Sequence, residues 1–333
     1  MRYLKIILVA LVFIPVLYSC NKKLNVNADW RDITVVYGLL NQNEDTTFIK
    51  ITKAFLGEGD ALMFAKIPDS SIYPGKLDVR LEEWSGSSLV KTFTLDTMTL
   101  HSKEAGDSIF YYPDQLVYYW PTGHLDENNT YRLKITHRNT GIVDSAITTM
   151  VHNFTVEEPD PFIKLVEYIP GHNFEVKFDQ AYGGKRYQLV IRFHYLETTP
   201  GGTVPKSFDW LVFNNLQIAD PNEISPDPIL QGFSGDIFYT VVAGNIKVDP
   251  NVTSRTARTV DYIFSVASED LNTYMEVTEP SESIIQERPS FSNIYNGIGL
   301  FSSRFVNEID SLVVGPNTQD ELKSNPLTAG LKF

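Results

Sequence analysis

Apolar and polar residues alternate along long stretches of this sequence, and this pattern limits the possible folds more than any other feature. Two segments of the first half have an apolar side chain at every second position: Leu77, Val79, Leu81, and Tyr131, Leu133, Ile135. Successive side chains of a β-strand point to opposite faces, so this period places one face on a core and the other in water. Turn residues follow each segment, at 85–88 and 139–141. The chain is therefore expected to be mainly β, with antiparallel sheets.

The first unit, residues 33–155, is predicted to be a sandwich of the immunoglobulin or fibronectin type. Leu125 lies six positions before Tyr131 in the segment Leu-Asp-Glu-Asn-Asn-Thr-Tyr. This spacing resembles the tyrosine corner of such sandwiches, in which a tyrosine hydroxyl bonds to the backbone a few residues upstream.

A second unit, residues 162–333, is expected after a boundary at residues 157–161, where two prolines and three acidic residues interrupt the strand pattern. Strand alternation returns, but helical spacing also occurs. A helix is predicted over residues 235–246, with Ser234 or Asp236 as its N-cap, and another after Ser268. Thr-Gln-Asp-Glu at 318–321 matches a capping box, which predicts a helix start there. The second unit is thus expected to be a β-rich domain with short α-helices.

Length and charge narrow the classes of function. With 333 residues, the chain exceeds the usual size of one domain, in agreement with two units. Its net charge is −13 and becomes −15 without residues 1–19, which hold two basic side chains. A nucleic-acid backbone binds cationic surfaces that release its counterions, so no nucleic acid is expected as a partner.

The first twenty residues carry an export signal. An apolar run over residues 6–17 follows two basic residues and is too short to cross a bilayer as a helix. Cys20 is the only cysteine, so no disulfide can form within the chain. Leu-Tyr-Ser-Cys at 17–20 resembles a bacterial lipobox, in which the cysteine is acylated and becomes the first residue after cleavage. The alternative is an ordinary secretory peptide beside an unrelated cysteine. We predict a signal peptide over residues 1–19, lipidation with palmitate at Cys20, and a tether over residues 20–32.

The predicted lipid would hold an otherwise water-soluble protein to a membrane. Asn21 follows the cysteine, and the absence of aspartate there is typical of lipoproteins of the outer membrane. Lys22 and Lys23 argue mildly against display on the cell surface. The expected location is the outer membrane, and the sequence leaves open which leaflet the protein faces.

Motifs of the common enzyme classes do not occur in the sequence. The six histidines lack the i, i+4 spacing beside a glutamate that marks a zinc hydrolase. Residues 232–235, Gly-Phe-Ser-Gly, lack one spacer of a nucleophile elbow. Gly297 and Gly299 resemble part of a dinucleotide fingerprint, but a strand pattern follows them, so we interpret them as sites of close backbone approach or of a bulge. No enzymatic activity, catalytic residue, metal or cofactor is expected.

Three consecutive aromatic residues, Tyr118, Tyr119 and Trp120, precede a proline. Rings on loops can stack on sugars, which makes the three residues a candidate ligand platform. Large rings in sandwiches are more often packed in the core or paired across strands, and we favour packing.

Two segments near the start, residues 34–40 and 49–57, and one near the end, residues 292–302, carry a resemblance to a known family. The last reads Ser-Asn-Ile-Tyr-Asn-Gly-Ile-Gly-Leu-Phe-Ser. With the lipobox, these segments resemble lipoproteins from Bacteroidetes that share a domain of unknown function and a terminal signature, Ser-Asn-Ile-x-Asn-Gly-x-Gly-x-Phe. The signature positions here are Asn293, Asn296, Gly297, Gly299 and Phe301. Ser302 stands where glycine or alanine is usual in that family.

Members of that family often accompany TonB-dependent outer-membrane receptors, so the resemblance implies an accessory role in binding or uptake. The leading hypothesis is a non-enzymatic outer-membrane lipoprotein that binds a receptor, another envelope protein or a ligand. One alternative is a fimbrial or adhesin subunit assembled by strand exchange. Another is a glycan-binding surface lipoprotein that uses the aromatic residues above. The sequence leaves the small-molecule or glycan ligand open.

Overall fold

The computed structural model describes most of the chain after its first 32 residues. The described residues are 33–54, 63, 67–73, 75, 77–101, 115–121, 125–279 and 290–333. The predicted signal peptide, Cys20 and the tether lie outside them. Within these ranges, no helix has the length and apolar character needed to cross a bilayer.

The first unit is a sandwich of two sheets. One sheet has the order β16-β1-β2-β6-β5, with β1 (Ile33–Leu40), β2 (Thr46–Ala54), β6 (Gln115–Pro121), β5 (Asp96–Leu100) and the first half of β16 (Gly297–Val314). The other has the order β4-β3-β7-β8, with β4 (Ser88–Thr94), β3 (Leu77–Ser85), β7 (Thr130–His137) and β8 (Val143–Thr149). A short helix, α3 (Pro68–Ser71), lies between β2 and β3 in the chain. The apolar positions of the alternating segments form the core, as expected: Leu77, Val79, Leu81, Tyr131, Leu133 and Ile135.

The predicted tyrosine corner is present. The Tyr131 hydroxyl accepts a hydrogen bond from Asp126 N at 2.8 Å and lies 3.2 Å from the Asp126 carbonyl oxygen, to which it can donate. Leu125, six positions upstream of the tyrosine, is buried in the same core. Burial raises the pKa of Tyr131 well above the usual tyrosine value, so the hydroxyl keeps its proton and can serve as donor and acceptor.

The second unit also has two facing sheets, and short helices pack beside them. One sheet has the order β13-β12-β15-β16, with β13 (Gly202–Gln217), β12 (Arg186–Thr199), β15 (Ser254–Ala267) and the second half of β16, and β10 (Leu165–Val166) pairs with β16. The other is β14-β11-β9, with β14 (Ile229–Ser234), β11 (Asn173–Phe178) and β9 (Val156–Glu158). The helices are α4 (Gly235–Asn245), α5 (Glu269–Thr278), α6 (Pro316–Ser324) and a 3-10 turn, η2 (Ala329–Leu331). The prediction of a mainly β chain, with a sandwich followed by a β-rich unit with short helices, is confirmed.

A second tyrosine corner, which was not predicted from the sequence, occurs in this unit. The Tyr187 hydroxyl accepts a hydrogen bond from Ala181 N at 2.8 Å, and Ala181 lies six positions upstream, whereas the donor in the first corner, Asp126, lies five positions upstream. Tyr187 is fully buried, and burial raises its pKa to about 12. Each unit therefore has a buried tyrosine whose hydroxyl bonds to the backbone a few residues upstream.

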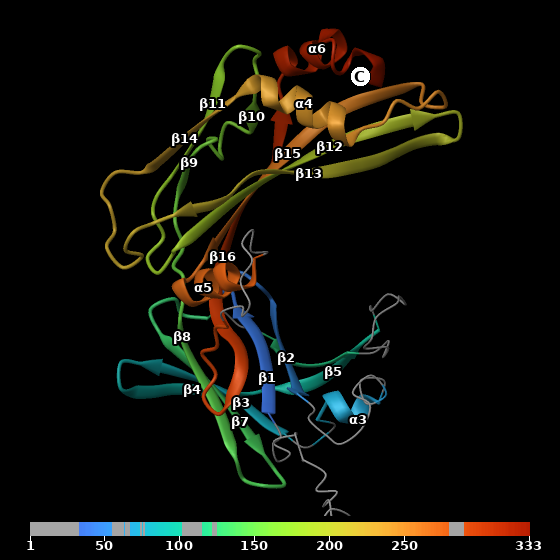
Figure 1. Cartoon of the computed structure of the whole chain (residues 1–333). Helices are drawn as coiled ribbons and strands as arrows, with labels where there is room; N and C mark the ends of the chain where they lie inside the picture. The colour runs from blue at the N-terminus through green and yellow to red at the C-terminus, as the bar shows by residue number, and fades with distance from the viewer. Residues whose placement is uncertain are drawn as a thin grey trace, which may run out of the picture.

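A single strand, β16, belongs to both units and joins their two larger sheets into one continuous nine-stranded sheet. Residues 297–303 pair in parallel with β1, and residues 304–313 pair antiparallel with β15. Figure 1 shows β16 running from the lower unit into the upper one, with the C-terminus at the far upper end. The proposed ranges 33–155 and 162–333 remain a prediction, and these pairings add the start of β16 to the first sandwich.

Hydrogen bonds and an ion pair brace β16 where it passes between the units. Ser303 is fully buried, and its hydroxyl donates to Thr149 O at 2.7 Å and accepts from Val151 N at 3.1 Å. Arg304 forms an ion pair with Glu44 at 2.8 Å. These contacts tie the strand to the first sandwich at the point where its partner changes from β1 to β15.

Two of the three helix predictions are confirmed, and the third is wrong at its start. Ser234 caps α4, and its hydroxyl accepts from Asp236 N. Ser268 is the N-cap residue of α5, although its hydroxyl bonds to Ser302 Oγ at 2.6 Å instead of capping the helix.

The capping box predicted at residues 318–321 does not form, because α6 already begins at Pro316. Proline is favoured in the first helical turn, where no backbone donor is needed. The Glu167 carboxylate, from the segment after β10, accepts from Thr318 N and Thr318 Oγ1 at 2.8 Å each. A tertiary contact therefore supplies the acceptor that the local motif was expected to provide.

Candidate binding site

The signature residues near the end of the chain hold β16 against β1. The Asn293 side chain pairs with the backbone of Phe301 in both directions, because Asn293 Nδ2 donates to Phe301 O at 2.7 Å and Phe301 N donates to Asn293 Oδ1 at 3.0 Å. Asn293 Nδ2 also donates to Asp270 Oδ2 of α5 at 2.8 Å. The Phe301 ring is fully buried in the first core. Asn293 thus ties the incoming chain to the strand that follows it.

The two signature glycines occur where β1 passes too close for a side chain. A Cβ on Gly299 would lie 2.0 Å from Val36 O, and the residue has a φ of +117°. A Cβ on Gly297 would lie 2.8 Å from Thr34 O. The expectation of close backbone approach is confirmed, and residues 297–314 form a strand.

Asn296 supplies the turn before the strand. It has a φ of +59°, in the left-handed region that asparagine tolerates, and its Nδ2 donates to Asp144 Oδ1 at 2.8 Å. Asp144 is buried, and its other oxygen accepts from His137 Nε2 at 2.8 Å. The described contacts of the signature therefore hold the chain in place in the first sandwich, and the Asn293–Asp270 contact also joins it to α5 of the second unit.

Removing the Asn293 amide should weaken this attachment. Asn293→Ala is expected to lower the free energy of unfolding by about 2 kcal/mol, because the backbone groups of Phe301 lose partners at a half-buried site. Urea titration with circular dichroism measures the change. Asn139→Ala, in an exposed turn, is the control and should alter stability by less than about 0.5 kcal/mol. Equal stability of the Asn293 variant and the wild type would contradict the assigned role.

The three aromatic residues proposed as a platform do not share a surface. They lie on β6, where alternation sends Tyr118 and Trp120 into the core at 2% and 3% exposure and Tyr119 to the other face. Burial raises the pKa of Tyr118 to about 12. Tyr119 pairs with Phe48 of β2, with ring centroids 6.3 Å apart. A platform that needs all three rings is therefore not present, and the interpretation as packing residues fits Tyr118 and Trp120.

A different site lies on the outward face of the long sheet in the second unit. Two strand registers shift there, one between β12 and β15 after Phe193, and one between β15 and β16 after Val260. Such bulges redirect side chains and often occur beside functional sites. An open hollow of about 470 Å³ has formed at this place. The acidic, basic and histidine residues of its lining are His194, Lys206, Arg258, Asp261, Glu308 and Asp310.

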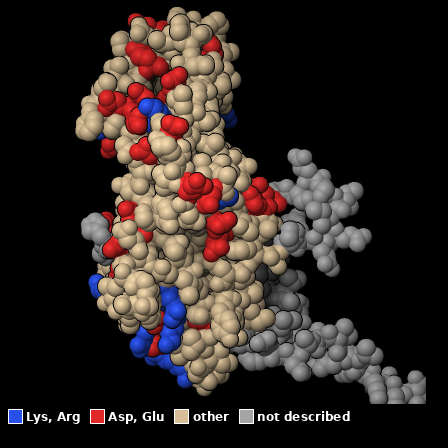
Figure 2. All heavy atoms as spheres, turned by 90° about the vertical axis from the view of Figure 1, so that its left-hand side faces the viewer, with Lys and Arg blue, Asp and Glu red and all other residues tan. Residues whose placement is uncertain are grey.

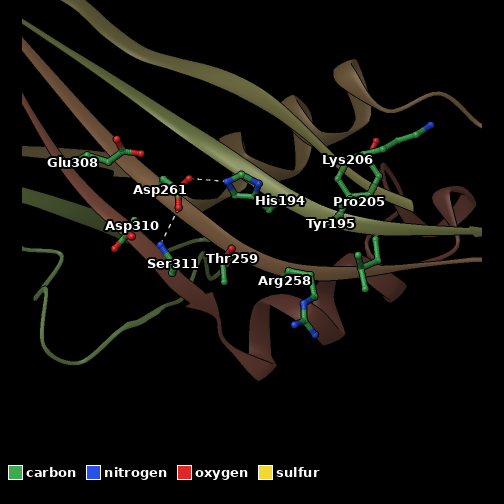
Figure 3. Close-up of a pocket in the computed structure, with 11 residues that line it drawn as sticks. His194, Tyr195, Pro205, Lys206, Arg258, Thr259, Asp261, Glu308, Asp310 and Ser311 are labelled. Atoms are coloured by element: carbon green, nitrogen blue, oxygen red, sulfur yellow. Dashed lines mark hydrogen bonds and ion pairs between the residues drawn. The ribbon is translucent and has the colours of Figure 1, made fainter. Parts of the chain in front are cut away.

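A histidine–aspartate pair lies at the centre of the hollow. His194 on β12 and Asp261 on β15 point toward each other, with 2.6 Å between His194 Nε2 and Asp261 Oδ2 (Figure 3). Because the carboxylate accepts, Nε2 carries a proton, and in the neutral ring Nδ1 is left as an acceptor. Ser311 N donates to the other Asp261 oxygen at 2.8 Å, and Ser311 has a φ of +59°. The bulge thus fixes the carboxylate from the side opposite to the histidine.

The hollow is electrostatically divided. Glu308 and Asp310 of β16 lie beside Asp261, whereas Lys206 and Arg258 lie toward the other end (Figure 3). Lys206 is paired with Glu197, and this hydrogen bond, together with Arg255, lowers the pKa of the Glu197 carboxyl. Nearby, Arg192 lowers the pKa of Asp209 through a bidentate ion pair. Arg192 Nε lies 2.7 Å from Asp209 Oδ1, and Arg192 Nη2 lies 3.0 Å from Asp209 Oδ2. The site can accept positive groups at one end and negative groups at the other.

Sequence reasoning did not single out this hollow. His194 was considered only for metal-binding spacing, and within the described ranges no group of three or more His, Cys, Asp or Glu side chains could hold a metal ion. The lining residues come from four strands. The bulges that bring them together depend on how these distant strands pair, which the local sequence does not show. The one local signal is charge at Arg258, Glu308 and Asp310 within segments rich in apolar residues.

Comparisons with known proteins identify no relative from which a function could be assigned. No protein-family model matches the chain, and no curated protein matches it. Among solved structures, the chain is similar to the C-terminal globular domain of an oligosaccharyltransferase from Pyrococcus abyssi, with 9% identity and a TM-score of 0.25 over 71% of this chain. The match spans 46% of that chain. A likeness of this degree carries no argument about fold or activity.

Proposed function

We propose that this chain is a lipid-anchored outer-membrane protein that works by binding, as an accessory of a TonB-dependent receptor. The observation that carries the binding role is the open hollow with charged side chains of both signs, on a sheet face that faces outward. The lipid anchor and the receptor rest on the lipobox at Cys20 and on the family resemblance.

The geometry of the hollow suits a polar segment of a partner protein. The His194–Asp261 pair is held by hydrogen bonds on two sides, so it meets a ligand with little loss of side-chain freedom. Acidic and basic groups at opposite ends would favour one orientation of a segment that carries both charges. The rings of Tyr118 and Trp120 are packed in the core, so no observation here favours the glycan alternative.

Strand exchange, the fimbrial alternative, is not favoured by the pairing of β1, the first described strand. β1 lies between β16 and β2, and its removal would break pairing on both sides. An exchanged strand is more readily accepted at a free sheet edge.

Purification of the native protein from outer membranes in mild detergent tests the proposal. We expect a TonB-dependent receptor, identified by mass spectrometry, in constant ratio to the protein. A variant with Arg258→Glu and Asp310→Lys should lose most of the receptor, because one charge at each end of the hollow is reversed. Lys323→Glu on α6 is the control and should retain it. Recovery of the protein without any receptor would refute the accessory role, and equal recovery by both variants would refute the hollow as the contact.

A further inference from the structure

Basic side chains gather at one end of the first sandwich, although the chain as a whole is acidic. Arg80 of β3 lies directly opposite Lys134 of β7, and Arg138 follows that strand in an exposed turn. Figure 2 views the left-hand side of Figure 1 and shows Lys and Arg over this lower part, whereas Asp and Glu prevail higher up. Asp78 neutralises Arg80 through a 2.9 Å ion pair. Within the described ranges, Lys134 and Arg138 form no ion pair.

The first described residues also lie at this end of the sandwich. Thr34, the second described residue, lies 3.1 Å from His137, with its Oγ1 facing the histidine Nε2. His137 directly precedes Arg138 in the sequence. The stretch from Cys20 to Ile33 can span on the order of 45 Å at most when fully extended. A lipid on Cys20 would therefore hold this end within about 45 Å of the bilayer surface.

Exposed apolar and aromatic side chains accompany the basic ones. Tyr295 is 74% exposed, and Ile142 and Val143 are 49% and 36% exposed. Tyr295 is held firmly, because its backbone N and O pair with Ser145 O and N at 2.7 and 3.2 Å. Tyrosine is typical of the membrane–water interface, where its ring meets apolar matter and its hydroxyl stays hydrated. We call these three residues with Arg80, Lys134 and Arg138 the basic end.

We propose that the basic end docks on the anionic headgroup layer of the membrane that holds the Cys20 lipid, an inference that rests on the anchor in the proposed function. The positive charge of the basic end is opposite to that of phosphate headgroups. Its exposed apolar side chains are of the kind that the membrane–water interface accommodates. Screening limits such attraction to about 8 Å at physiological salt, so only groups at this end take part. Docking here would direct the second unit, with its hollow, away from the bilayer (Figure 1).

Binding of the unlipidated chain to vesicles isolates the docking from the anchor. The mature chain with Cys20→Ser is titrated with phosphatidylcholine vesicles that contain a minority of phosphatidylglycerol. Each basic side chain near an anionic surface contributes about fivefold to the binding constant. Lys134→Glu with Arg138→Glu should therefore weaken binding at least about tenfold. Lys247→Glu with Lys323→Glu makes the same change of net charge in the second unit and should leave binding within about twofold.

The position of the docked end is tested in the lipidated protein. Cys20 is the only cysteine and is consumed by the lipid, so Asn139→Cys gives a single site for a fluorophore beside Arg138. Quencher-labelled lipid should reduce the emission of this fluorophore when the protein is in the anionic vesicles. The reduction should be smaller in pure phosphatidylcholine vesicles, and smaller for the Lys134→Glu, Arg138→Glu variant in the anionic vesicles. Equal quenching in all three cases would overturn the proposal.

Two further outcomes also overturn the proposal. One is equal vesicle binding by the two charge variants. The other is binding of inorganic polyphosphate as tight as binding of the anionic vesicles, which would indicate a soluble polyanion as the ligand. Because the titration uses no acyl chain, it gives its answer even if Cys20 proves not to be lipidated, so failure of the docking and failure of the anchor remain distinguishable.

Discussion

Gly299→Ala is expected to lower the free energy of unfolding by about 4 kcal/mol or more, a loss that few single substitutions reach. The added Cβ would lie 2.0 Å from Val36 O of β1, and the φ of +117° is itself unfavourable for alanine. Relief of the clash requires β16 and β1 to separate. This strand pair joins residues 297–303 to residues 34–40 of the first sandwich. Urea unfolding followed by circular dichroism measures the effect.

The Gly141→Ala variant is a control that distinguishes the steric clash at Gly299 from the backbone strain of a positive φ. Gly141 also has a positive φ, +71°, but a Cβ there would meet nothing within 4 Å. Its replacement should cost only about 1 kcal/mol, the price of the left-handed conformation alone. If the two variants lose the same stability, the close approach of β1 and β16 does not explain the signature glycine.

Arg255→Met is expected to cost about 2–4 kcal/mol, because it removes the buried one of the two cations that pair with the Glu197 carboxylate, and only Lys206 remains. The guanidinium donates to Glu197 Oε2 at 2.8 and 3.0 Å and to the carbonyl oxygens of Leu331 and Lys247 at 2.5 and 3.1 Å. Arg255 and Glu197 are both buried, so the variant leaves a carboxylate and two carbonyls without this donor. The C-terminal residues, which Arg255 N also binds through Lys332 O, should detach first.

Arg192→Met is the matched control for this prediction. It removes an ion pair of similar geometry, but Arg192 and Asp209 are 40% and 50% exposed. Exposed pairs contribute at most about 1 kcal/mol. Thermal and urea denaturation of both variants measure the difference. A loss below about 1 kcal/mol for Arg255→Met would show that the buried network does not hold the C-terminus.

Local features of the fold were predictable from sequence because they depend on neighbouring residues. The alternation at residues 77–81 and 131–135 predicted β3 and β7, and the spacing of Leu125 and Tyr131 predicted the corner. The same six-residue spacing links Ala181 and Tyr187, so the second corner could have been found in the same way. Pro316 likewise signalled the true start of α6, and Glu167 provides its acceptor from another element.

The passage of β16 through both units could not be predicted from the local pattern. Residues 297–314 alternate like any strand, and nothing local says that the partner changes from β1 to β15 near Arg304. The hollow escaped prediction for the same reason, since His194 and Asp261 are 67 positions apart and meet through bulged pairing. The glycines were informative because their role, close approach of two backbones, excludes other residue types.

The mass of the N-terminal peptide of the native membrane protein tests the central claim, that a lipid at Cys20 holds this binding protein in the envelope. We expect a peptide that begins at Cys20 and carries a diacylglycerol thioether, with palmitate incorporated during growth. An unmodified cysteine, or an N-terminus elsewhere in a protein recovered from the soluble fraction, would contradict it.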